Sequence, residues 1–165
     1  MKKITFILFA LIAGTTFAQN TDNGTATASA SIVSAITIAD GTTLNFGKIL
    51  KGTAGTVAIS TAGLRSVTGV TEIVGTAVSA STFVVNASDG YVYDVTFIPS
   101  ITLTNGSTAT GTKTMTVDTF IHDAGVTPTG TGADQNLNVG ATLHVVADQV
   151  EGNYSGTASV TVTYQ

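Results

Sequence analysis

The sequence predicts an all-β protein that folds as a single antiparallel β-sandwich after a signal peptide. Three observations support this fold class. After Ala18 no apolar residues recur at helical spacing, and Thr and Val, whose branched side chains favour strands, dominate the chain. Apolar and polar residues alternate with a period of two in several segments. Turn dipeptides such as Asp89-Gly90 separate these segments, which is typical of a sandwich.

The start of the chain has the three parts of a secretory signal peptide. Lys2 and Lys3 form a basic region, Ile4–Ala13 is apolar, and Thr16-Phe17-Ala18 places small residues where a signal peptidase cleaves. We expect residues 1–18 to be removed by cleavage after Ala18. The apolar run is shorter than the roughly 20 residues that a membrane span needs. The mature chain is therefore expected to have no membrane span and to reach the extracellular space or the cell surface through the periplasm.

An alternating segment follows the signal peptide. Ala26, Ala28, Ala30 and Ile32 share one face of an extended chain, with Thr and Ser residues between them. We expect residues 19–30 to form an N-terminal extension and residues 31–165 to form the sandwich domain.

The expected strands follow in order, with turn signals between them. They are Ser31–Ala39, Thr42–Leu50, Thr56–Ser60, Ser66–Val74, Thr82–Ala87, Tyr91–Ile98, Ile101–Thr104, Thr114–Ile121, Leu137–Ala147 and Tyr154–Tyr164. Asp40-Gly41, Asp89-Gly90 and Asn105-Gly106 are expected to supply the positive φ of primed hairpin turns. The residues expected in the core are Phe46, Phe83, Phe97, Val160, Val162 and Tyr164. Tyr91 and Tyr93 share a strand face with Val95 and Phe97 and are also expected to be core residues.

Composition and charge exclude several classes of function. The formal net charge is −4, and it falls to −6 once Lys2 and Lys3 are removed. An acidic chain lacks the basic surface that nucleic-acid binding requires. The absence of Cys excludes disulfides, thiol catalysis and cysteine-ligated metals. We expect no nucleic-acid partner and no cofactor.

The chain offers few catalytic residues. His122 and His144 are the two histidines, and neither lies in a motif that sets a base against a nucleophile. Both are expected on the surface, and the protein is not expected to be an enzyme. The pattern Asp134-x-Asn136-x-Asn138-x-Gly140 is similar to the start of a calcium loop, but Leu137 and Val139 alternate with the polar residues. This alternation favours the polar face of a strand, and no metal site is expected.

Both ends of the mature chain carry recognisable motifs. The first is the stretch from Ala26 to Ile38 followed by Leu44-Asn-Phe-Gly47, and the second is Gly152-Asn-Tyr-Ser-Gly156 followed by Val160-Thr-Val-Thr-Tyr164. With these motifs the mature chain resembles a bacterial family of secreted β-domains catalogued as domain of unknown function 4402. Its ends are also similar to those of spore-coat-U-type subunits of archaic chaperone–usher pili, which end in an alternating strand with a penultimate Tyr. Ala35 stands where those subunits carry a Cys.

The pilin resemblance implies an Ig-like, pilin-like sandwich that lacks one strand and receives it from a neighbouring subunit. Residues 19–30 would be the donated strand, with Ala26, Ala28, Ala30 and Ile32 entering the groove. The C-terminal groove strand would present one row of residues to it. That row is Gly152, Ala158, Val160, Val162 and Tyr164. Identical or related subunits would be the partners, with a periplasmic chaperone as a further partner.

Two hypotheses about function follow. In the first, the protein is a secreted structural surface protein, a fimbria-like or coat subunit that assembles by strand exchange. In the second, it is a self-complete Ig-like extracellular module that binds a glycan or another partner through its loops, as an adhesin does. Sugar sites commonly use exposed aromatic residues, and the chain has no Trp. The first hypothesis is therefore favoured.

Overall fold

A computed structural model describes residues 21–165. This part of the chain contains no helix and nine strands, and it divides into a compact unit, Val33–Gln165, and a separate unit that includes residues 21–32. The strands are β1 (Thr37–Asp40), β2 (Gly55–Ile59), β3 (Arg65–Thr68), β4 (Ser81–Asn86), β5 (Tyr93–Phe97), β6 (Ser100–Thr104), β7 (Thr114–His122), β8 (Asp134–Val145) and β9 (Val160–Tyr164). No helix within residues 21–165 has the length and apolar character to cross a membrane.

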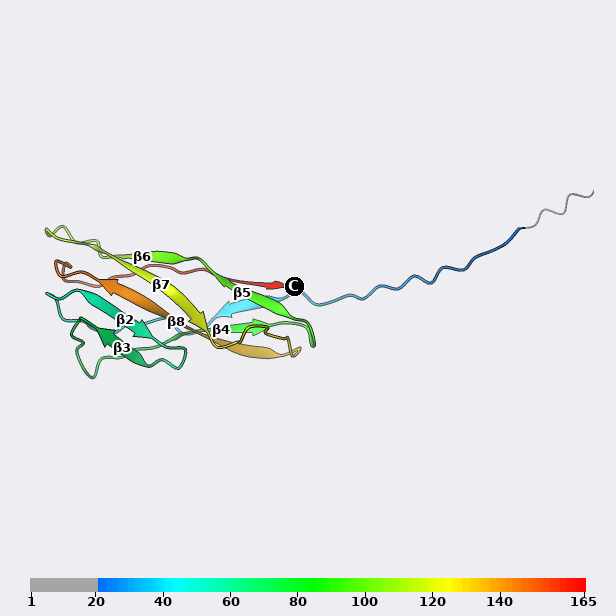
Figure 1. The fold of residues 1–165 in the computed structure, drawn as a ribbon, viewed down its shortest axis with the longest axis horizontal. Helices are drawn as coiled ribbons and strands as arrows, with labels where there is room; N and C mark the ends of the chain where they lie inside the picture. Colours follow the sequence, from blue (N-terminus) through cyan, green and yellow to red (C-terminus); the bar gives the residue numbers. More distant parts are fainter. Residues whose placement is uncertain (1–20) are drawn as a thin grey trace, which may run out of the picture. The chain divides into compact units, whose positions relative to one another are not determined.

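The compact unit is built on a seven-stranded antiparallel sheet with β8 at its centre (Figure 1). One edge of β8 pairs with β4 through residues 134–139 and with β2 through residues 141–145. Its other edge pairs with β7, which pairs in turn with β6. Gly140 stands where β8 changes from one neighbour to the other. A Cβ atom there would lie 2.2 Å from the carbonyl oxygen of Ile59, so the close approach of the strands requires glycine.

A second sheet consists of β5 and β9. Two apolar clusters form the core, because alternate residues of each strand point inward. The first contains buried residues of β2, β7 and β8, and the second joins β4 and β8 to β5 and β9. Phe120 packs against both clusters. The prediction of an all-β antiparallel sandwich is confirmed.

The predicted core residues point inward. Phe46 is buried, whereas Phe83, Phe97, Val160, Val162 and Tyr164 are partly buried and pack against the second cluster. Tyr93 is buried with them, but Tyr91 is 42% exposed, so the prediction for Tyr91 is wrong. Tyr91 precedes β5, and its ring packs edge-on against Tyr164 at the surface.

The turn predictions were only partly correct. Asp40-Gly41 does not form a hairpin, since Thr37–Asp40 pairs with β4 and Asn45 then pairs with Ser79 of the same neighbouring segment. The chain therefore continues in one direction. Gly41 has no positive φ, and its role is close packing, because a Cβ would lie 2.7 Å from the carbonyl oxygen of Thr82.

The other two dipeptides also differ from two-residue hairpins. Gly90 has a φ of 77°, but β4 and β5, which it connects, lie in different sheets. Asn105-Gly106 begins a longer connection from β6 to β7. The strand expected over Ser31–Ala39 begins only at Thr37, and Thr42–Leu50 makes isolated bridges at Asn45 and Ile49.

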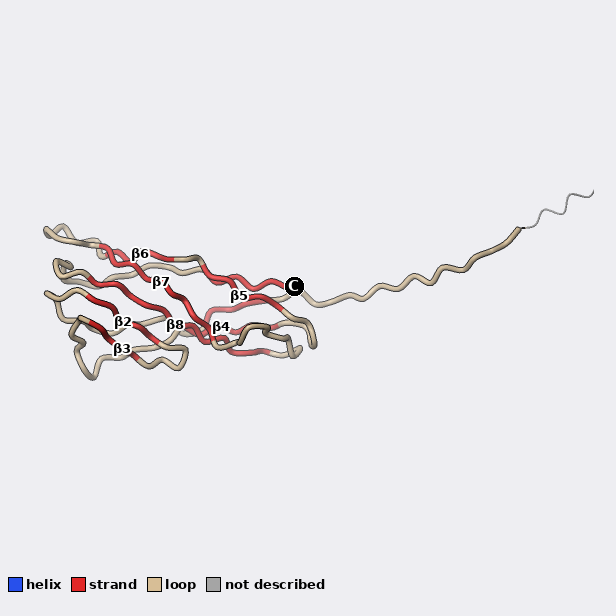
Figure 2. Tube along the Cα trace, in the orientation of Figure 1, coloured by secondary structure: helices blue, strands red, loops and turns tan. Residues whose placement is uncertain are grey.

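Residues 21–32 contain no strand and are all exposed (Figure 2). This segment holds Ala26, Ala28, Ala30 and Ile32, and Ile32 is 99% exposed. The predicted signal peptide, residues 1–18, lies outside the described residues, so cleavage after Ala18 stays a prediction.

Candidate functional site: an open groove between two unpaired edges

A groove of about 1000 Å³ runs along the compact unit. We call residues 40–51 its first wall and residues 151–160 its second wall. Its floor is the inner face of the seven-stranded sheet. The floor residues are Ile101, Leu103, Met115, Val117, Phe120, Val139, Leu143 and Val145. The groove is therefore apolar at its base and bounded by backbone on both sides.

The backbone–backbone hydrogen bonds of the first wall lie on one of its edges, and the carbonyl oxygen of Phe46 accepts from the Arg65 side chain. Asn45 exchanges both backbone hydrogen bonds with Ser79, at 2.9 and 3.0 Å. Further along, the carbonyl oxygen of Lys48 accepts from Ile73 and the N–H of Leu50 donates to Thr71. These bonds all join the first wall to residues 71–79, and Gly47, with a φ of 77°, interrupts the alternation between them.

The second wall is also paired on one edge. Ser155 exchanges both backbone hydrogen bonds with Thr104 of β6, at 2.9 and 3.0 Å. Beyond it, β9 pairs with β5, and the described part of the chain gives β9 no other neighbour. Gly156 permits this arrangement, because a Cβ there would lie 2.7 Å from the carbonyl oxygen of Thr102.

Unpaired backbone groups therefore face the groove from both walls. In an extended chain, the N–H and C=O groups of successive residues point to opposite edges. Since Asn45 and Ser155 point outward, Leu44 and the pair Tyr154 and Gly156 point into the groove. Their backbone groups make no hydrogen bond to any of residues 21–165. These edges have the donors and acceptors that an additional strand would use.

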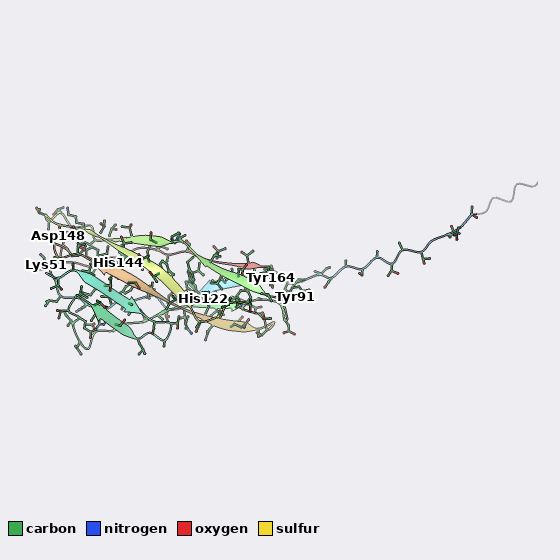
Figure 3. All side chains as sticks on the ribbon, in the orientation of Figure 1. Lys51, Tyr91, His122, His144, Asp148 and Tyr164 are labelled. Atoms are coloured by element: carbon green, nitrogen blue, oxygen red, sulfur yellow. The ribbon has the colours of Figure 1, made fainter. Side chains whose placement is uncertain are left out.

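The two walls run antiparallel to each other. At one end, the Tyr164 hydroxyl donates to the carbonyl oxygen of Ser34 at 3.1 Å. At the other end, Lys51 Nζ lies 3.8 Å from Glu151 Oε1. Figure 3 shows Lys51 and Tyr164 near opposite ends of the compact unit. A strand placed between the walls would thus be parallel to one wall and antiparallel to the other.

Part of the predicted C-terminal groove strand lines this groove. Gly152, Ala158 and Val160 are lining residues, whereas Val162 and Tyr164 lie beyond them and pack against the second core cluster. The predicted alternation is confirmed, since Val160 and Val162 are partly buried and Thr161 is exposed.

Sequence reasoning did not identify the first wall as part of the site. The sequence predicts an ordinary strand, Thr42–Leu50, where the structure has isolated bridges. It also missed Arg65, which holds this wall in place. The guanidinium donates to the carbonyl oxygens of Phe46 at 3.2 Å and Ile73 at 3.3 Å, and it forms an ion pair with Glu72. The side chain of Arg65 is only 8% exposed.

The two histidines lie outside the groove. His144 is exposed on the outer face of β8, as expected, and its Nε2 lies 2.9 Å from Asp118 Oδ1. This hydrogen bond, together with a second from the Thr119 hydroxyl, lowers the pKa of the Asp118 carboxyl below its ordinary value. No hydroxyl of residues 21–165 bonds to the His144 ring. The surface prediction for His122 is wrong: its ring is half-buried and 5.8 Å from that of Phe97.

The acidic and amide residues of the calcium-loop-like pattern lie in a strand. Asp134, Asn136 and Asn138 are on one face of β8, and Leu137 and Val139 are buried on the other. The interpretation as a polar strand face is confirmed.

Comparison with known proteins gives one match. The model of a family described as Domain of unknown function (DUF4402) matches residues 36–164, which is most of the chain. No curated protein and no solved structure matches it.

Proposed function

The chain belongs to the family described as Domain of unknown function (DUF4402), and we propose that it is a secreted structural surface protein, a fimbria-like or coat subunit. In this proposal, copies assemble by exchanging a β-strand. The supporting observation is the groove whose two walls both present unpaired backbone edges over an apolar floor.

Residues 21–32 have the properties of the inserted strand. They comprise twelve residues, as does the first wall, and both would extend to roughly 40 Å at about 3.3 Å per residue. Ala26, Ala28, Ala30 and Ile32 would place apolar side chains on the floor, while the intervening Thr and Ser residues would face solvent. Inserted strands of this kind gain affinity from main-chain hydrogen bonds and specificity from alternate side chains.

The sequence next to this segment favours insertion into a second copy. Filling its own groove would require the chain to reverse between Ile32 and the start of β1. The intervening residues, Val33-Ser34-Ala35-Ile36, include no Gly, Pro, Asn or Asp, and Ser34 is the one residue among them of a type that is common in tight turns. The Ser34 carbonyl is also already bonded to Tyr164.

Two consequences follow for the free subunit. Open strand edges promote association with other chains, so the subunit is expected to need a periplasmic chaperone before assembly. Export through the periplasm to the cell surface is consistent with the predicted signal peptide at residues 1–18.

Light scattering on the mature chain, residues 19–165, tests the proposal. We expect oligomers that shorten when a free peptide of residues 19–32 is added in excess, because the peptide occupies grooves without offering a new one. A matched control peptide carries Asp at positions 26, 28 and 30, and it should have no effect. A stable monomer that binds neither peptide would exclude strand exchange and favour the self-complete binding module.

A further inference from the structure

The chain carries two Asn-Gly dipeptides, and the structure places them in opposite environments. They are Asn23-Gly24 and Asn105-Gly106, and each is followed by a hydroxyl residue. In such a dipeptide the backbone nitrogen of Gly can attack the side-chain amide carbon of the preceding Asn, because Gly has no Cβ to hinder the approach. The reaction needs an Asn side chain that is free to turn toward that nitrogen, so its rate depends on the local structure.

Asn23-Gly24 is open to this reaction. Both residues are exposed and lie in residues 21–32, which contain no strand. No backbone hydrogen bond joins either residue to another part of residues 21–165. A Cβ atom at Gly24 would meet no atom within 4 Å. The Asn23 amide and the Gly24 nitrogen are therefore accessible to water and to each other.

Asn105-Gly106 is closed to the same reaction. The Asn105 residue is 6% exposed, and hydrogen bonds hold both ends of its amide. Its Oδ1 accepts from the backbone N–H of Ser107 at 3.1 Å, and its Nδ2 donates to the carbonyl oxygens of Val150 and Glu151, both at 3.4 Å. Turning this amide toward the Gly106 nitrogen would break these hydrogen bonds in a buried site, where the freed groups find no replacement.

We propose that Asn23 is a site of spontaneous deamidation and that the fold protects Asn105 from the same reaction. The Gly24 nitrogen loses its proton and forms a bond to Cγ of Asn23. The bond from Cγ to Nδ2 breaks, ammonia leaves, and a five-membered succinimide ring is closed. Water then opens the ring at either of its carbonyl groups, which leaves an aspartate or an isoaspartate at position 23. The overall reaction consumes one water and releases one ammonia.

The modification changes the segment that we propose as the inserted strand. It adds a carboxylate next to Asp22, and the formal net charge of the mature chain falls from −6 to −7. A strand paired along both edges holds its backbone extended and uses its N–H groups in hydrogen bonds, so insertion should protect Asn23. The product would then accumulate on copies whose segment stays free. This protection rests on the proposed function, whereas the assignment of Asn23 does not.

Peptide mapping by mass spectrometry tests the assignment on the mature chain, residues 19–165. The chain carries Ala28→Asp, so that its segment stays out of the grooves of other copies. After incubation at mildly alkaline pH we expect a mass increase of about 1 Da in the peptide that contains Asn23 and no increase in the peptide that contains Asn105. In denaturing urea the two sites should react at similar rates. Gly24→Ala should slow the reaction at Asn23 about tenfold, since a Cβ crowds the attacking nitrogen.

Two results would overturn the assignment. One is an Asn23 that stays unmodified in the folded chain for a time in which the urea-unfolded chain reacts, and the other is a folded chain in which Asn105 reacts as fast as Asn23. Thr27→Asp separates this inference from the proposed function, because it adds the same charge and is expected to assemble. Asn23 should react more slowly in Thr27→Asp than in Ala28→Asp. Equal rates would contradict insertion of residues 21–32 and support the assignment of Asn23 in both chains.

Discussion

The hydroxyl of Tyr164 donates a hydrogen bond to the carbonyl oxygen of Ser34, 130 residues earlier in the chain. The Tyr164 hydroxyl oxygen in turn accepts a hydrogen bond from the backbone N–H of Ser88 at 2.7 Å. The penultimate residue thus joins the last strand to the segment before β1 and to the end of β4. This contact lies beyond the lining of the groove, close to the start of the compact unit at Val33.

Tyr164→Phe tests the importance of this contact. The variant loses both hydrogen bonds and keeps the aromatic ring, so we expect a loss of about 1–2 kcal/mol in the free energy of unfolding. Urea denaturation measures it. Tyr91→Phe is the matched control, because its ring packs against Tyr164 and its hydroxyl makes no hydrogen bond to residues 21–165. Equal stability of the two variants would mean that the Tyr164 hydroxyl contributes nothing.

Arg65→Met removes the buried guanidinium behind the first wall. The carbonyl oxygens of Phe46 and Ile73 lose a charged donor, and Glu72 loses its ion-pair partner. Hydrogen bonds to charged groups contribute about 1.5–3 kcal/mol each, and Glu72 is partly solvated, so we expect a destabilisation of about 2–4 kcal/mol. Melting curves provide the measurement. Lys51→Met is the control, since its ion pair with Glu151 is exposed, and it should change stability by less than about 1 kcal/mol.

The pair of Asp118 and His144 makes a pH-dependent contribution to stability. The pKa of the Asp118 carboxyl is lowered in the folded protein, so its contribution is present above the ordinary Asp pKa of about 3.9 and is lost as pH falls through the folded value. His144→Ala should raise the pKa of Asp118 toward the ordinary value. Thr119→Ala should raise it less, because the Thr119 bond is the smaller cause. NMR titration of the Asp118 carboxyl carbon measures both, and the reverse order would contradict this assignment.

Adjacent substitutions in β9 test its register. Val162 is partly buried opposite Val95, so Val162→Asp would bring a charge against the apolar cluster and cost about 2–5 kcal/mol. Thr161 is exposed, and Thr161→Asp should cost about 1 kcal/mol or less. Thermal unfolding compares the two. A Thr161→Asp variant as unstable as Val162→Asp would show that the strand faces the other way.

The alternation of apolar and polar residues predicted the fold class well, because successive side chains of a strand point to opposite faces and the apolar ones mark the buried face. The strand from Val160 to Tyr164 and its inward row follow from sequence alone. The groove could not be predicted in the same way. It depends on which edges remain unpaired, and that follows from long-range contacts such as Asn45 with Ser79 and Ser155 with Thr104.

The roles of side chains whose partners are distant in the sequence could not be predicted either. No residue close to Arg65 in the sequence indicates that its side chain contacts the backbone of Phe46. The sequence likewise gives no sign that Gln149, which is buried and donates to the carbonyl oxygens of Thr112 and Thr114, differs from an ordinary loop residue. Asp40-Gly41 shows a related limit. Its composition is that of a hairpin turn, but both flanking segments pair with the same neighbour, and tertiary pairing overrides the local turn preference.

The inward row of the inserted segment gives a final test of strand exchange. Ala28→Asp would place a carboxylate over the apolar floor of a second copy, where it has no partner, so assembly should be lost. Thr27→Asp adds the same charge on the opposite face, which the proposed insertion leaves in solvent, and it should assemble nearly as well as the unaltered chain. Both residues are exposed and lie outside the compact unit, so neither variant should change the melting temperature of that unit. Light scattering at equal concentration separates the two variants. Equal loss of assembly in both would assign the effect to net charge, and retained assembly in Ala28→Asp would show that this row does not enter the groove.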